Sequence, residues 1–204
     1  MNLIKMIKRR LWLRVLIPVS FIVCLVIGTS VLFNSSYQEK CSREQMNHQN
    51  IALTQVIESS MFDSLSTGDN DVVRRQFQRI NQTLPDIKVY VYDFNGTITF
   101  STQADDIGRS INDFLTPAAQ DGIAGMLETG NAFTGINEAQ IADSGFVFDS
   151  QGIKNEAKCY HCHGASKKIL GGMTVFTPSD EILRNISKGK MINWVTGVAG
   201  LILI

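Results

Sequence analysis

The sequence lacks a net charge, an internal repeat and a low-complexity tract. Its 19 Lys and Arg residues balance its 19 Asp and Glu residues over 204 positions, so the composition does not indicate a surface for nucleic acid. No acid, base and nucleophile constellation typical of an enzyme site is recognisable either. The length suits one ordinary domain with flanking segments. We therefore expect no nucleic-acid partner and no catalytic site in this region.

Charged side chains are also absent from residues 15–33 and 191–204. A helix of 19 residues spans roughly 28 Å, close to the ~30 Å of a bilayer core. We therefore predict a transmembrane helix at residues 15–33. Residues 1–14 are basic, and the positive-inside rule keeps them in the cytoplasm. The basic residues of this segment are Lys5, Lys8, Arg9, Arg10 and Arg14.

A cleaved signal peptide is the alternative for the N-terminus, since it also joins a basic region to an apolar run. The run is longer than a usual signal-peptide core, and only Gly28-Thr29-Ser30 offers a weak cleavage site. The second apolar run, residues 191–204, is too short to cross a bilayer. We expect it to be the start of a second transmembrane helix that continues beyond Ile204, although an interfacial tail is the alternative. Residues 34–190 then form one extracytoplasmic domain.

The hydrophobic pattern of this domain predicts an α+β fold with an antiparallel sheet. Apolar residues at three- and four-residue steps predict a long helix from residue 34 to Gly68 and a second helix that ends before Pro85. Residues 87–93 and 97–101 flank a turn and predict a hairpin. The further expected elements are a helix at 111–128 interrupted at Pro117 and strands at 133–138, 141–149 and 169–176.

The chemically most specific feature is Cys159-Tyr160-His161-Cys162-His163. Two cysteines three positions apart, followed directly by histidine, are typical of the attachment of one c-type haem. The thiols add to the two vinyl groups, and the imidazole of His163 reaches the iron from the proximal side. We therefore predict one covalent haem c, attached by Cys159 and Cys162 and ligated by His163.

Three other interpretations of this motif remain open. A zinc site needs further ligands, and Cys41 and His48 are far away in the sequence. A thioredoxin-type motif should follow a strand in a βαβ pattern, whereas residues 154–158 are polar. A disulfide between Cys159 and Cys162 would close a very small loop and leave His163 unexplained.

The sixth ligand of the iron decides which function such a haem serves. A thioether or a second imidazole gives a low-spin iron, and an open position admits a gas ligand. The candidates are Met46, His48, Met61 and Met173, each of which also suits a helix surface or the core. We predict Met61, because it lies on the apolar stripe of the long helix that faces the domain. His161 is placed on the proximal side.

Residues 152–164 resemble the haem-attachment segment of periplasmic sensor domains in bacterial chemoreceptors and sensor histidine kinases. Residues 169–175 resemble the closing strand of the same family. The resemblance implies a PAS- or Cache-like fold with a long N-terminal helix, Cys159 and Cys162 as thioether attachment points, and His163 as axial ligand. It also implies a HAMP linker and a cytoplasmic signalling module, which can be a kinase, after the second transmembrane helix.

We therefore expect a sensor of the inner membrane with its domain in the periplasm, transmitting a redox or small-gas signal across the membrane. We also expect a homodimer, in which Cys41 of parallel helices could pair with its twin, although a lone thiol is the alternative. The competing hypothesis is a membrane-anchored monohaem cytochrome for periplasmic electron transfer. A low-spin iron with two protein ligands would favour the cytochrome.

Overall fold

The computed structural model describes residues 11–131, 133, 137–141 and 144–180, together with residues 184, 188, 189 and 191. Its internal contacts divide the chain into two units, Met1–Ser42 with Ile182–Ile204, and Arg43–Glu181. The second unit holds the sheet and the motif at Cys159. The expected second transmembrane helix lies outside the described residues, apart from Met191.

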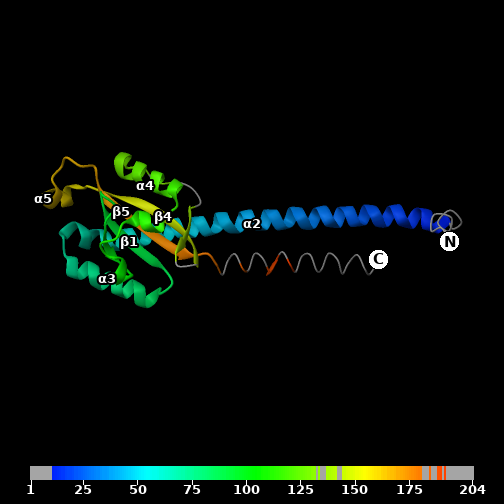
Figure 1. Cartoon of the computed structure of the whole chain (residues 1–204), viewed down its shortest axis with the longest axis horizontal. Helices are drawn as coiled ribbons and strands as arrows, with labels where there is room; N and C mark the ends of the chain where they lie inside the picture. The colour runs from blue at the N-terminus through cyan, green and yellow to red at the C-terminus, as the bar shows by residue number, and fades with distance from the viewer. Residues whose placement is uncertain are drawn as a thin grey trace. The chain divides into compact units, whose positions relative to one another are not determined.

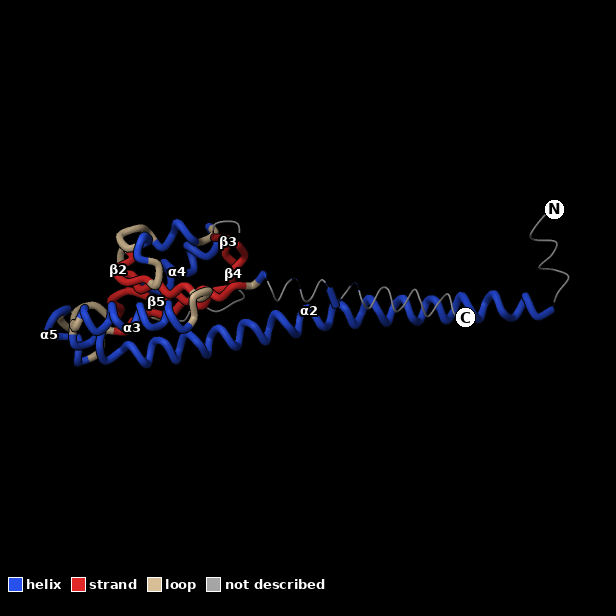
Figure 2. The backbone as a smooth tube through the Cα atoms, turned by 90° about the horizontal axis from the view of Figure 1, so that it is seen from below, coloured by secondary structure: helices blue, strands red, loops and turns tan. Residues whose placement is uncertain are grey.

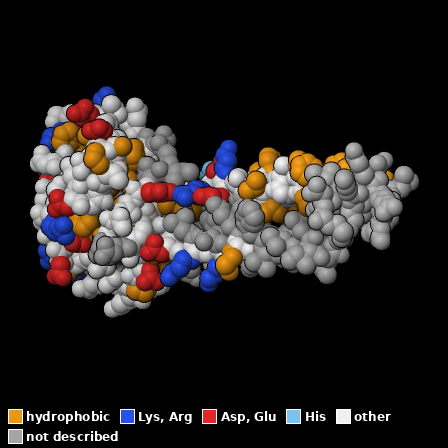
Figure 3. Space-filling model, turned by 45° about the vertical axis from the view of Figure 1, so that its right-hand side comes forward, with side chains coloured by type: hydrophobic (Ala, Val, Ile, Leu, Met, Phe, Trp, Pro, Cys, Tyr) orange, Lys and Arg blue, Asp and Glu red, His pale blue; other side chains and the backbone are white. Residues whose placement is uncertain are grey.

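The longest element is helix α2, Leu11–Thr67, with 57 residues (Figure 1). It joins the expected transmembrane helix and the expected periodic helix after residue 34 in one continuous element. Most large apolar side chains between Val15 and Phe33 are exposed and form a run of orange in Figure 3. Among the described residues, this is the one helix apolar enough over 18 residues to cross a membrane, with a mean hydropathy of 2.6. That criterion is one of length and composition, so the crossing remains a prediction.

The end of α2 and the start of the next helix follow from local chemistry. Gly68 has a left-handed backbone with φ of 70°, which glycine adopts without steric cost. Asp69 then accepts a hydrogen bond from the Val72 amide at 3.0 Å and caps α3, Asn70–Thr83. This helix ends ahead of Pro85, because proline disfavours a helical residue before it. Both predicted amphipathic helices are confirmed.

Five antiparallel strands form one sheet in the order β2-β1-β5-β4-β3. The predicted hairpin is confirmed as β1 and β2, joined through the turn at Asn95 and Gly96. Together with the preceding helices, the sheet confirms the predicted α+β class. The strands are β1 (Lys88–Asp93), β2 (Ile98–Ser101), β3 (Asn137–Ile141), β4 (Ser144–Lys154) and β5 (Ile169–Pro178).

Two strand predictions need correction. The expected strands at 133–138 and 141–149 are β3, which ends at Ile141, and β4, which begins at Ser144 and runs to Lys154. Ile141 pairs with Ser144 in the antiparallel ladder of β3 and β4. The far end of β4 is extended because it continues to pair with β5. Pairing with neighbouring strands sets these ends, which the local alternation of side chains does not reveal.

The sheet separates two apolar clusters, because alternate residues of a strand point to opposite faces. Val89 and Val91 pack with α2 and α3, whereas Tyr90 and Tyr92 pack with α4, Pro117–Thr129. Figure 2 shows α2 and α3 along one face of the sheet and α4 on the other. The domain therefore has three layers, with the sheet in the middle.

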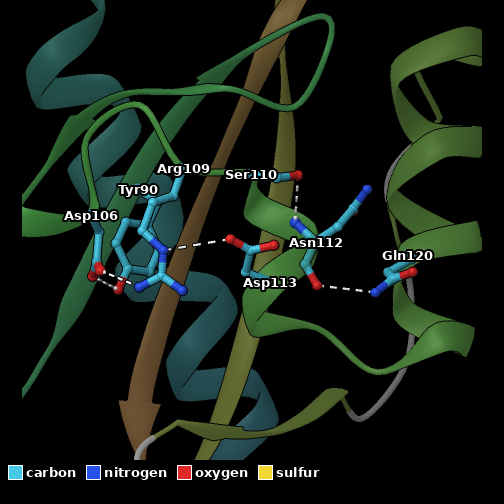
Figure 4. Close-up of polar contacts among 7 residues, drawn as sticks. All are labelled: Tyr90, Asp106, Arg109, Ser110, Asn112, Asp113 and Gln120. Atoms are coloured by element: carbon cyan, nitrogen blue, oxygen red, sulfur yellow. Dashed lines mark hydrogen bonds and ion pairs between the residues drawn. The ribbon is translucent and has the colours of Figure 1, made fainter.

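Polar contacts fix the connection between β2 and α4 (Figure 4). The Tyr90 hydroxyl donates to Asp106 Oδ2 at 2.8 Å, and Arg109 pairs with Asp106 at 2.9 Å and with Asp113 at 3.4 Å. Burial, with the adjacent Asp106, raises the pKa of Tyr90 and keeps its hydroxyl a donor. The connection contains the 3-10 helices η1 (Ala104–Asp106) and η2 (Ile111–Phe114). The predicted helix at 111–128 is accordingly split before Pro117.

Candidate functional site: a pocket beside the Cys-x-x-Cys-His motif

The motif lies on a short helical segment between β4 and β5. Cys159 ends the 3-10 helix η3, Ala157–Cys159, and α5 follows as Tyr160–His163. Residues three apart in a helical turn lie on one face, which brings Cys159 and Cys162 side by side. Both thiols are free, with Cys159 buried and Cys162 exposed. The segment can therefore present two thiols and an imidazole to one ligand.

Asn155 holds the two ends of this segment together. Its side-chain amide donates to the carbonyls of Gly164 at 2.7 Å and Lys167 at 2.8 Å, and its backbone amide donates to Lys168 at 2.8 Å. The chain leaves α5 through Gly164, which has a positive φ of 68°. The motif is thus the closed end of a loop that both β4 and β5 anchor.

A pocket of ≈ 500 Å³ adjoins the motif, a volume typical of small-molecule and cofactor sites. Its walls come from the end of α2, the start of α3, strands β1, β2, β4 and β5, and the motif segment with α5. Cys159, Cys162 and His163 all line it. The other lining residues are Phe62, Leu65, Ser66, Gly68, Asn70, Arg74, Val91, Tyr92, Asp93, Thr99, Phe100, Ile153, Leu170 and Gly171. The structure therefore brings the three motif residues to one largely apolar cavity.

Arg74 is the cation on the wall of this pocket. Its side chain is 69% exposed, and its guanidinium lies 3.9 Å from the Asp71 carboxylate, a long and solvated pair. Asp93, on the same wall, already accepts hydrogen bonds from the Asn95 and Thr97 amides at 2.9 Å. Burial raises the pKa of Tyr92 to about 12, so its hydroxyl stays neutral. The pocket can therefore meet an acidic group of a ligand at Arg74.

A second connection joins the motif segment to α2. Lys158 donates to Asp63 Oδ1 at 2.9 Å, and its ammonium lies 5.9 Å from the centre of the Phe62 ring. The hydrogen bond to Asp63 raises the pKa of Lys158. Phe62 itself lines the pocket. One turn of α2 thus contacts both the cavity and the residue directly before Cys159.

Met61, the predicted distal ligand of the iron, does not lie in this pocket. Met61 is fully buried in the cluster between α2, α3 and the sheet, together with Met173. It is not among the residues that line the pocket, because its side chain is enclosed in that core cluster. Iron ligation by Met61 remains a prediction. Met46 is buried elsewhere on α2, and His48 is exposed.

Sequence reasoning missed most of the pocket. Phe62, Arg74 and Phe100 lie between 59 and 97 positions before Cys159, and no local pattern links them to the motif. One signal was present in the sequence, since Gly68, Asp69 and Asn70 mark the turn between the long helix and the next one. That turn places the start of α3 beside the pocket.

No family model matches this sequence. Three solved structures similar to the chain are sensor or ligand-binding domains. The ligand-binding domain of the Campylobacter jejuni chemoreceptor Tlp3, in complex with 4-methylisoleucine, has a TM-score of 0.49 and 20% identity, covering 78% of this chain and 63% of that one. The V. cholerae histidine kinase DctB sensor domain has a TM-score of 0.46 and 16% identity, covering 75% and 55%. The sensor region of a sensor histidine kinase has a TM-score of 0.35 and 7% identity, covering 48% and 41%.

The chain thus spans less than two thirds of the length of each of these domains. The ligand of each of these domains is a property of that domain and is not transferred to this chain.

Proposed function

We propose that this chain is the periplasmic input domain of a sensor in the inner membrane, with one haem c attached through Cys159 and Cys162 and ligated by His163. The observation that carries the proposal is the shared pocket of these three residues, which the end of α2 also lines. That helix also contains the candidate membrane span. A change in the pocket therefore acts directly on an element that leads to the membrane.

The residues of the pocket fit a porphyrin. Two free thiols lie on one face of a helical turn, next to the imidazole. Phe62, Leu65 and Phe100 offer an apolar wall for the ring, and Arg74 can pair with an acidic substituent. When bound, the haem supplies an iron centre that changes oxidation state or takes a small gas ligand.

The chain's own residues can transmit a change in the pocket. Phe62 faces the cavity, and Asp63 binds Lys158 next to Cys159. Any displacement of α5 then alters the packing of Phe62 and the position of Asp63 on α2. Signal transmission by small shifts of packed helices is a common device in proteins. We infer that α2 is the output element, in a homodimer of this domain.

Covalent attachment is tested with the full 204-residue chain, expressed with the cytochrome c maturation machinery and purified in detergent. We expect haem to stay with the chain on a denaturing gel. The double variant Cys159→Ala, Cys162→Ala should lose it, while Cys41→Ala, a change at an exposed thiol of α2, should keep it. A wild-type chain without covalent haem, under conditions that mature a reference cytochrome, overturns the proposal.

The sensor role needs a second measurement, because a membrane-anchored cytochrome would also attach haem. Exposure of Tyr160, His161 and Cys162 favours this alternative, since a redox partner could approach them. Spin labels on exposed positions of α2, such as Gln55, report its packing in the oxidised, reduced and CO-bound chain. We expect distances that differ between these states. Identical distances in all three would favour the cytochrome.

A further inference from the structure

A second pocket, of ≈ 730 Å³, lies on another side of α2. One wall is a row of α2 side chains one turn apart, among them Ile51, Gln55, Glu58 and Phe62. The opposite wall is the outer part of β4. Gly130 and Phe133 also line the pocket. The pocket is therefore a groove between α2 and the second half of β4.

The charge of this groove is unbalanced. Three acidic residues line it, Glu58, Asp149 and Glu156, against one basic residue, Lys154. Asp149 is only 6% exposed, and its carboxylate accepts hydrogen bonds from the side chains of Gln151 and Thr54 and from the Ser150 backbone. Neither Asp149 nor Glu58 forms an ion pair with a residue that the structure describes. A buried carboxylate without a cationic partner is costly, and a bound cation would offset that cost.

The rest of the lining indicates what kind of cation fits. Ile51 and Phe62 are apolar, and Asn47, Gln55 and Gln151 offer amide groups. Within the described part of the chain, no three His, Cys, Asp or Glu side chains come together closely enough to hold a metal ion. The groove therefore suits an organic cation with an apolar body better than a bare metal ion.

We propose that this groove binds a small organic ammonium compound, with Asp149 and Glu58 receiving the charged group and Ile51 and Phe62 contacting its apolar part. Burial raises the pKa of both carboxyl groups, and Lys154 acts in the opposite direction on Glu58. Phe62 lines both pockets, so an occupant of the groove would touch the same α2 residue as the haem pocket. The site does not depend on haem attachment.

Three probes of matched shape test the proposal by calorimetry on the full chain in detergent: 2-phenylethylamine, 2-phenylethanol and phenylacetate. We expect saturable binding of the amine and about tenfold weaker binding of the alcohol, because a charged hydrogen bond is lost. Phenylacetate should not bind. Equal binding of the amine and the alcohol, or no saturable binding of the amine, overturns the proposal.

Variants test whether Asp149 and Glu58 bind the ammonium group. Asp149→Asn and Glu58→Gln should each weaken amine binding by about tenfold, whereas Asp121→Asn, an exposed change on α4, should leave it unchanged. Micelle partition of the amine is the same for all variants and cancels. Glu58→Gln keeps the test decisive if Asp149→Asn unfolds the chain, and unchanged binding in both variants contradicts the proposal. The Cys159→Ala, Cys162→Ala chain should still bind the amine, which separates this site from the haem proposal.

Discussion

Lys158 and Asp63 are 95 positions apart in the sequence, and the lysine ammonium donates to the aspartate carboxylate at 2.9 Å. One residue precedes the first cysteine of the motif, and the other lies on the last two turns of α2 before Gly68. Both side chains are largely exposed, at 63% and 84%. Such a pair adds little to folding stability in water, and it is a direct contact between the motif segment and the helix.

Breaking this pair should therefore affect transmission rather than folding. For Asp63→Asn we expect a melting temperature close to that of the wild type, and a reduced difference in α2 spin-label distances between oxidised and reduced chains. Asp113→Asn breaks another exposed pair, with Arg109 at 3.4 Å, and should leave those distances unchanged. If both variants behave alike, Asp63 has no part in transmission.

His163 and His161 lie on the same short helix but should differ in their effects. His163 lines the pocket, whereas a ring nitrogen of His161 lies 2.9 Å from the Lys158 carbonyl. We expect His163→Ala to retain covalent haem through the two cysteines and to change the absorption spectrum, because the axial ligand is gone. His161→Ala should keep the wild-type spectrum. The reverse result would assign the ligand to His161.

Variants of Met61 distinguish a role in core packing from a role as iron ligand. Met61→Ala should cost about 2–5 kcal/mol in unfolding free energy, because the site is fully buried. Met61→Leu preserves volume and should cost less than about 1.5 kcal/mol. The absorption spectrum of the Met61→Leu chain then decides the question. An unchanged spectrum means that the thioether is a core side chain, and a changed one supports the predicted ligation.

The buried Asp149 predicts a dependence of stability on pH. Burial raises the pKa of its carboxyl group in the folded chain above 3.8. The stability that the protonated Asp149 carboxyl group contributes to the folded chain is fully present below pH 3.8. It is lost as the pH rises through the folded pKa, because this carboxyl group ionises at a lower pH in the unfolded chain. Burial also raises the pKa of Glu58, while the positive charge of Lys154 acts to lower it. Between pH 3 and pH 7, chemical denaturation should show a smaller loss of unfolding free energy for Asp149→Asn than for the wild type. A loss of equal size in both chains would contradict the assignment to Asp149.

Gly172 is required by the sheet. A Cβ atom at this position would lie 2.5 Å from the hydroxyl oxygen of Tyr92, on the facing residue of β1. Gly172→Ala should therefore destabilise the domain by about 1–3 kcal/mol through overpacking. Gly125→Ala on α4 meets no atom within 4 Å and should stabilise it, by roughly 0.5–1 kcal/mol. Thermal melts of the two variants give the comparison.

Several features were predictable because they depend on near neighbours in the chain. The spacing of Cys159, Cys162 and His163 places them within one helical turn. The apolar period of α2 and α3, the turn at Gly96 and the break before Pro117 are likewise local. The positions of β3 and β4 were predicted less well, because Ile141 and Lys154 acquire their strand ends from partners across the sheet.

The sequence by itself determined the motif, the uncharged segment at residues 15–33 and the α+β class, since each depends on residue type and short-range spacing. Only the tertiary structure decided that Phe62 and Arg74 face the motif, that Lys158 meets Asp63, and that Met61 lies in the core. Those contacts join residues 85 to 97 positions apart or depend on which side of α2 faces the sheet. Helix packing and strand register decide them, and neither is encoded in a local pattern.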